Sequence, residues 1–246
     1  MRFIQKLLGA GIENFEQDSR AWGLTLRQAL AIAAIPIVVV LVMAATVPFF
    51  DLFVRLIDED SVIEWLQFLL ILAACLLFAW LSLRLFRSRF LTVGVLYLLV
   101  TLGTFFVAGE EIAWGQTLFG WGTPAALGAI NYQHETTLHN ISTLHGPFIY
   151  AVMLGALYGA LVPLLAAAFW NKRPYAIPRH LLVPPLCLVP AFFMPFGYRF
   201  FRLVFRPERW YPHLAFPITE FSEVTELCLY FGLLLFAWLN LRRLPQ

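Results

Sequence analysis

The sequence predicts an all-α integral membrane protein, in which residues 1–246 form one membrane domain of about six spanning helices. Hydrophobic residues make up 61% of the chain and charged residues only 13%, whereas a soluble domain carries about 25% charged residues. The apolar residues occur in continuous runs of about 20, the length that crosses a bilayer as a helix. They do not alternate with polar residues as the strands of a membrane barrel would.

Residues 1–28 precede the first apolar run and predict an amphipathic helix on the membrane surface. This stretch mixes basic and acidic residues, so it lacks the basic start and apolar run of a secretory signal peptide. Its apolar residues recur at helical spacing, as in helices that lie in the membrane interface. They are Phe3, Ile4, Leu7, Leu8 and Ile12.

The six apolar runs predict spans at residues 30–50, 61–83, 90–114, 147–170, 180–198 and 219–241. The fifth run contains four prolines, which predict kinks that neighbouring helices must accommodate. Those prolines are Pro184, Pro185, Pro190 and Pro195. The three cysteines, Cys75, Cys187 and Cys228, all fall inside apolar runs, and we interpret them as small packing residues.

Charge is distributed unevenly between the two ends of these spans. With six spans, 12 of the 17 basic residues share a side with both termini, and this predicts an inner-membrane protein with cytoplasmic termini. The opposite, non-cytoplasmic end holds 12 of the 15 acids and four of the five histidines. Arg199, Arg202 and Arg206 are exceptions to this distribution, because they are basic residues at the non-cytoplasmic end. Their spacing places them on one face of a helix, and Pro207 ends that helix. They either neutralise the acids or hold an anionic group such as a lipid phosphate.

Residues 115–146 form a polar loop between the third and fourth spans. Thr123 and Pro124 are typical of a helix start, so we expect a short helix from Pro124. A second short helix is expected from about residue 134 to 144, where Glu135 and His139 would share one face. Such a loop is either re-entrant or interfacial, and at membrane depth it must line a protein cavity.

Several acids occupy positions that helix capping does not explain. Glu110 and Glu111 end a helix, where the dipole disfavours acids, so they need a proton, a positive partner or a metal. Glu223 and Glu226 lie too deep in the last span to cap it, whereas Glu64 follows Ser61 at the spacing of a capping box.

Carboxylate and imidazole groups in this number suit a divalent cation, namely zinc, iron or manganese. The candidate metal ligands are Glu64, Glu111, Glu135, His139, Glu223 and Glu226; the candidate catalytic residues are Glu110, Glu111, Glu135 and His139; and the candidate substrate-binding residues are Trp114, Gln116, Asn140, Arg199, Arg202 and Arg206. Trp114 also fits the alternative of an interfacial anchor.

The motifs Gly109-Glu-Glu-Ile-Ala-Trp-Gly-Gln116 and Leu138-His-Asn140, with Glu64-Trp65 after an acidic turn, resemble a family of bacterial multi-pass membrane proteins of uncharacterised function. The resemblance covers about residues 58–140 and the acids of the last span. It implies that these residues form one site, and it implies no reaction.

Three hypotheses for the function remain. The first is a metal-dependent hydrolase or transferase that acts on a lipid-like, anionic substrate at the non-cytoplasmic face, with membrane lipid as its partner and no nucleic acid. The second is an ion- or proton-coupled transporter, although the cytoplasmic halves of the second and sixth spans are almost wholly apolar. The third is a structural subunit of a membrane complex. The sequence does not predict the oligomeric state.

Overall fold

The computed structural model describes residues 2–58, 61–88, 90–131, 134–169 and 178–243. In these ranges the chain is mainly helical, and its one β-bridge is an isolated pair, Asn131 and Ile141. Six helical stretches are long and apolar enough to cross a membrane, which confirms the predicted all-α polytopic bundle. Five of the charged residues counted above lie outside the described ranges: Glu59, Asp60, Arg89, Lys172 and Arg173.

The spanning helices begin and end within a few residues of the predicted limits, except the fifth. Two 3-10 turns, η2 (Arg179–Leu181) and η3 (Leu186–Leu188), take up its first part around Pro184 and Pro185, because prolines remove backbone donors that a helix interior needs. The long helices are α2 (Leu26–Thr46), α4 (Val62–Phe86), α5 (Leu91–Glu111), α8 (His145–Phe169), α9 (Val189–Phe205) and α11 (Ala215–Arg243).

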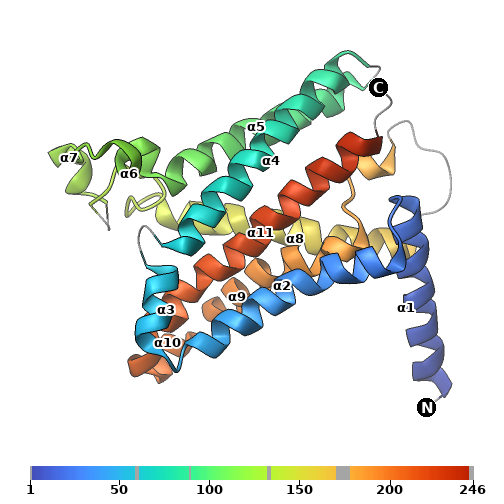
Figure 1. Cartoon of the computed structure of the whole chain (residues 1–246), viewed down its shortest axis with the longest axis horizontal. Coiled ribbons are helices and arrows are strands. Elements are labelled where there is room, and N and C mark those ends of the chain that lie inside the picture. The colour runs from blue at the N-terminus through green and yellow to red at the C-terminus, as the bar shows by residue number, and fades with distance from the viewer. Residues whose placement is uncertain (1, 59–60, 89, 132–133, 170–177, 244–246) are drawn as a thin grey trace.

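The long helices pack as a chain of neighbours in the order α5, α4, α11, α9, α8. Helix α2 packs on α9 and α11. Figure 1 shows α11 ending near α1, at the opposite end of the bundle from the polar loop. An apolar cluster that includes Phe78, Leu81, Leu85 and Leu181 fills the bundle between α4, α5 and η2.

Helix α1 (Arg2–Ala21) lies across the end of the bundle and not along it (Figure 1). The Asp18 carboxylate accepts a hydrogen bond of 2.7 Å from the Leu186 N–H, and this bond ties α1 to η3. Trp22 packs edge-on against the ring of His180. The crosswise placement is the one that a surface helix adopts when its apolar face meets the bilayer interface.

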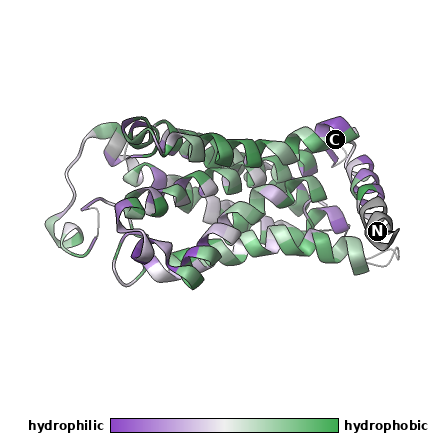
Figure 2. Cartoon of the chain, turned by 90° about the horizontal axis from the view of Figure 1, so that it is seen from below, coloured by the Kyte–Doolittle hydropathy of each residue, from purple (hydrophilic) through white to green (hydrophobic). Residues whose placement is uncertain are grey.

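Short elements gather at the end of the bundle opposite α1. The sequence reading missed α3 (Phe50–Ile57), which follows α2 directly. The others are η1 (Ala113–Gly115), α6 (Gln116–Phe119), α7 (Ala125–Gly128), α10 (Pro207–Trp210) and η4 (Pro212–Leu214). Figure 2 shows hydrophobic residues along the helices and hydrophilic residues gathered toward their ends.

The structure contains one of the two short helices that were expected in the polar loop. Helix α7 follows Pro124, as expected, but the predicted helix from residue 134 to 144 is wrong, since the described part consists of turns. The Asn131 side-chain amide donates to the Thr137 carbonyl at 2.7 Å, and His134 adopts a left-handed φ of 58°. These local bonds compete with helix formation. Elements α6 and α7 project beyond α5 (Figure 1), so this part of the loop is not re-entrant.

Candidate functional site

A cavity of about 770 Å³ lies at the loop end of the bundle, between α4, α5, α8, α9 and α11. Nine carboxylic acids but only three arginines line it, so an excess of negative charge faces one space. Segments far apart in the sequence thus contribute to a single chamber. The cavity brings together eleven of the candidate site residues, namely Glu64, Glu110, Glu111, Glu135, His139, Asn140, Arg199, Arg202, Arg206, Glu223 and Glu226. Trp114 and Gln116 are not among its lining residues.

Glu110 anchors the polar loop to the end of α5. Its carboxylate accepts hydrogen bonds from the backbone N–H groups of Leu138 and His139, both at 2.7 Å. It also accepts from Trp114 Nε1 at 2.5 Å and contacts His139 Nδ1 at 2.9 Å. Four donors satisfy a carboxylate that the helix dipole disfavours at this position. These donors provide the compensation that the helix-end position of Glu110 requires, three of them as neutral N–H groups.

Trp114 reaches Glu110 because the chain reverses sharply after α5. Ala113 and Trp114 have positive φ values of 43° and 55°, and Gly115 continues the turn with a φ of 95°. The indole ring then folds back over Gly109, where an added Cβ would lie 2.9 Å from the ring. Glycine is therefore required at residue 109 for close approach and at residue 115 for backbone conformation.

Replacing Gly109 with alanine is expected to displace Trp114, whereas the same change at Gly103 meets no atom within 4 Å. Both glycines lie in α5 and gain about 1 kcal/mol of helix propensity as alanine, but only Gly109→Ala adds a clash. We therefore expect Gly103→Ala to raise the melting temperature in detergent and Gly109→Ala to leave it unchanged or lower it. Equal stabilisation by both, with unchanged tryptophan fluorescence, would contradict this packing.

Gln116 acts inside the loop and not on the cavity. Its Oε1 accepts from the Thr136 N–H and the Thr136 hydroxyl, both at 2.8 Å, and its Nε2 donates to the Thr123 hydroxyl at 3.0 Å. The side chain thus joins the two arms of the loop. We interpret Gln116 and Trp114 as positioning residues, in place of the substrate contacts expected from the sequence.

His139 is oriented by Glu110 at the cavity wall. Its side chain is 40% exposed, whereas that of Glu110 is 4% exposed. Burial disfavours the imidazolium, but the hydrogen bond and charge of Glu110 outweigh it and raise the pKa of His139 above its ordinary value of 6.5. In the neutral form, Nδ1–H donates to Glu110 and Nε2 keeps its lone pair. The pair has the arrangement of an oriented general base.

Tyr230 joins two of the carboxyl groups deep in the cavity. Its hydroxyl lies 2.8 Å from Glu111 Oε1 and 3.2 Å from Glu226 Oε2. One phenol proton serves one acceptor, so the second contact is a hydrogen bond only if that carboxyl group carries a proton. Arg199 pairs with the other oxygen of Glu226. The sequence reading missed Tyr230, although it follows Glu226 by four residues on the same helix face.

Gln67 is the second residue of this cluster that the sequence reading missed. The buried Gln67 amide donates to the backbone oxygen of Glu223 at 3.0 Å and to its carboxylate at 3.1 Å. Its own carbonyl oxygen has no hydrogen-bond partner in the described part of the chain. Glu64 lies one turn earlier on α4, where its N–H donates to the Ser61 hydroxyl at 3.4 Å, and its side chain also lines the cavity. The capping and cavity interpretations of Glu64 are therefore compatible.

The three arginines in and just after α9 differ in their partners. Arg199 neutralises Glu226, which is the first role expected from the sequence. Arg202 donates only weakly, at 3.3 Å, to the Thr219 carbonyl. The Nε atoms of Arg199 and Arg202 are buried without a partner in the described residues, and buried donors of this kind usually have one. Arg206 lines the cavity from the residue that follows α9, where its left-handed φ of 46° precedes Pro207.

Within the described residues, no group of three or more His, Cys, Asp or Glu side chains is arranged to hold a metal ion. Comparison with known proteins adds no assignment, since no family model, curated protein or solved structure matches the chain. Any function must therefore be argued from the cavity itself.

Proposed function

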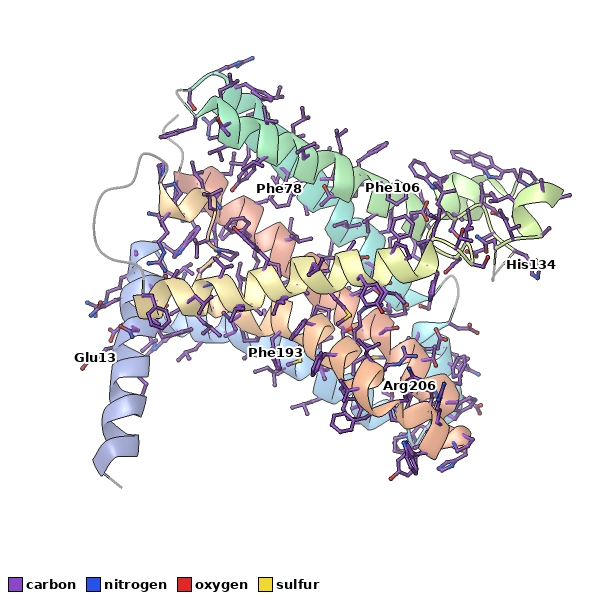
Figure 3. The ribbon with its side chains drawn as sticks, turned by 180° about the vertical axis from the view of Figure 1, so that it is seen from behind. Glu13, Phe78, Phe106, His134, Phe193 and Arg206 are labelled. Atoms are coloured by element: carbon purple, nitrogen blue, oxygen red, sulfur yellow. The ribbon has the colours of Figure 1, made fainter. Side chains whose placement is uncertain are left out.

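We propose that the protein is a membrane-embedded enzyme, a hydrolase or transferase, that acts on an anionic amphiphile at the non-cytoplasmic face of the membrane. The observation that carries this proposal is that one cavity contains an oriented histidine, arginine side chains and an apolar wall. A substrate with a charged head and a hydrocarbon tail matches these three surfaces. Figure 3 shows Phe106, His134 and Arg206 toward one end of the bundle and Glu13 toward the other.

His139 is the proposed general base of this enzyme. Its Nδ1 is held by Glu110, so Nε2 is free to take a proton from water or from an acceptor hydroxyl. Glu110 is a positioning residue in this scheme, because all four of its contacts hold the loop and the imidazole. This assignment revises the direct catalytic role that the sequence suggested for Glu110.

Arg202 and Arg206 are the proposed contacts to the anionic head group. Arg199 is already paired with Glu226, whereas Arg202 is in none of the ion pairs found among the described residues. Guanidinium groups bind phosphate oxygens bidentately. Both arginines line the cavity that His139 lines, so the head group and the proposed base would share one space.

A divalent cation remains the proposed cofactor, because among the ion pairs of the described residues only Arg199 contacts the group formed by Glu111, Glu223 and Glu226. Glu111, Glu223 and Glu226, which all line the cavity, are the proposed ligands. Elemental analysis should then find zinc, iron or manganese in the purified wild-type protein, and the double variant Glu111→Gln, Glu223→Gln should lose it. Glu208→Gln, Glu220→Gln is the matched control on the same cavity. Equal metal content in both variants would remove these ligands from the proposal.

An assay of the protein in nanodiscs tests the function. Mixed phospholipids are incubated with the protein in ¹⁸O-labelled water, and mass spectrometry detects hydrolysed or exchanged head groups. Loss of a general base reduces rates about a hundredfold or more, so His139→Ala should nearly abolish the product. His134→Ala, which changes a loop histidine outside the cavity lining, should retain it. Absence of product from every lipid class, or equal rates in both variants, would refute the proposal.

The pH dependence of this activity follows from the Glu110–His139 pair. The base must be neutral, so activity should rise with pH through a midpoint above 6.5, since Glu110 raises the pKa of His139. In Glu110→Gln any residual activity should have a lower midpoint, because the hydrogen bond and charge that do most to raise the pKa of His139 against the effect of burial are removed. The stability that comes from the raised pKa of His139 has the opposite trend: it is present below the ordinary histidine pKa of 6.5 and is lost as pH rises through the folded-state pKa. A wild-type midpoint below 6.5 would contradict this role.

The apolar packing near α1 supports an enzyme over a transporter. Residues Phe78, Leu81, Leu85 and Leu181 are buried together between the cavity and the α1 end. Ions or protons would need polar groups to cross this layer. Flux of ions across liposomes containing the protein would favour the transporter instead.

A further inference from the structure

The cavity has an apolar side where α5 and α8 face each other. Phe106 and Val107 line it from α5, and Ile149, Val152 and Met153 line it from α8. Four of the nine acids lie on α4 and α11, and the two acids of α5, Glu110 and Glu111, are the last two residues of that helix, beyond Phe106 and Val107. Polar and apolar surfaces are therefore continuous within one space, as an amphiphile would require.

Helices α5 and α8 are the first and last helices in the series of neighbours α5, α4, α11, α9, α8, and neither is the main packing partner of the other. Helix α5 packs on α4, and α8 packs on α9. The rings of Phe106 and Phe148 stack across the gap, with centroids 5.5 Å apart and planes 8° apart. Figure 3 shows the two helices diverging from the region of Phe106 toward the α1 end. Both are membrane-spanning helices, so this side of the cavity faces the bilayer.

We propose that the gap between α5 and α8 is a lateral portal, which admits a hydrocarbon chain of a phospholipid from the bilayer while its phosphate reaches Arg202 and Arg206. The identity of the head group rests on the function proposed above; the portal itself rests on the apolar walls and the helix packing. A lipid entering by this route keeps its chain out of water, and each methylene exposed to water is unfavourable. The substrate class is thereby narrowed to lipids that remain in the membrane.

Photo-crosslinking of the full chain in nanodiscs tests the portal. The probe is a phosphatidic acid with a diazirine in one acyl chain, and mass spectrometry maps the labelled residues. Met153 is 8% exposed and lines the cavity, whereas Leu154 is 67% exposed and serves as the lipid-facing reference on the same helix. We expect label on both residues. Label on Leu154 without label on Met153 would overturn the portal.

Variants that fill the portal with a larger side chain provide a second test. Val152→Trp adds bulk inside the portal, where overpacking is unfavourable, and should reduce labelling of Met153 by about fivefold or more. Ala151→Trp is the matched control, because its neighbouring position does not line the cavity. Label at Leu154 should be unchanged in both, and this also reports that the variants are folded. Equal Met153 labelling in Val152→Trp and wild type would overturn the proposal.

The proposed enzyme and the proposed portal can be contradicted independently of each other. Labelling does not need catalysis, so His139→Ala should keep the wild-type pattern. If Met153 is labelled but no lipid is converted, the portal stands and the proposed enzyme does not. If the protein cleaves a water-soluble phosphate ester while Met153 remains unlabelled, the enzyme stands and the portal is wrong.

Discussion

Replacing Glu110 with alanine is expected to release the polar loop from the helical bundle. The change removes the acceptor for the N–H groups of Leu138 and His139 and for the indole of Trp114. These hydrogen bonds are partly buried and each has a charged acceptor, and bonds of this kind contribute about 1.5–3 kcal/mol each. A loss of about 3 kcal/mol corresponds to an increase of about a hundredfold in the exchange of the two amides with deuterium. Enzymatic activity should disappear together with this protection.

Glu135→Ala is the matched control for this experiment. It removes another carboxylate of the same loop and cavity, but its side chain does not accept from the two amides that Glu110 holds. The exchange of Leu138 and His139 should stay slow in this control. Slow exchange in Glu110→Ala as well would show that something other than Glu110 holds the loop.

Replacing Arg199 with methionine is expected to destabilise the whole bundle. The Arg199 and Glu226 side chains are only 12% and 14% exposed, so the change leaves a carboxylate uncompensated beside Glu111 and Glu223. Removal of one partner from a buried ion pair costs about 3 kcal/mol or more. Thermal unfolding in detergent should show this as a large decrease in melting temperature.

Two further variants distinguish the effect of breaking the Arg199–Glu226 ion pair from the effect of removing an arginine from the cavity. Arg202→Met removes a guanidinium that lines the same cavity and pairs with no carboxylate among the described ion pairs, so its effect should be small. Adding Glu226→Gln to Arg199→Met should recover much of the lost stability, because the uncompensated charge is gone. Additive losses in the double variant would argue that the pair contributes little.

The fold could largely be predicted because the spans are long and apolar, and apolar length alone identifies a membrane helix. Helix α3 was missed because it is short and follows α2 after a break of only a few residues. The loop helix expected around Glu135 and His139 is absent, since spacing of four residues is compatible with helices but does not require one. The Asn131 side chain satisfies this backbone instead.

The site was predictable in its charges but not in its contacts. Glu110 and Glu111 are adjacent and look equivalent in the sequence, yet Glu110 holds the loop and Glu111 contacts Tyr230. A helix turns about 100° per residue, so adjacent acids must face different neighbours. Gln67 carries no charge, so its position beside Glu223 had no signal beyond a polar residue within an apolar run.

The proposed function requires one chamber that four separate segments share and that opens to water at one end of the membrane. Cysteine accessibility tests this most directly, in a background where the buried Cys75, Cys187 and Cys228 are replaced. Glu64, Glu111, His139 and Glu223 are changed singly to cysteine and treated with a charged, membrane-impermeant thiol reagent on either side of sealed vesicles. All four should react from the same side, while Leu81→Cys, from the apolar cluster, should react from neither. Reaction from opposite sides, or protection of Glu111→Cys and Glu223→Cys from both, would contradict the shared chamber.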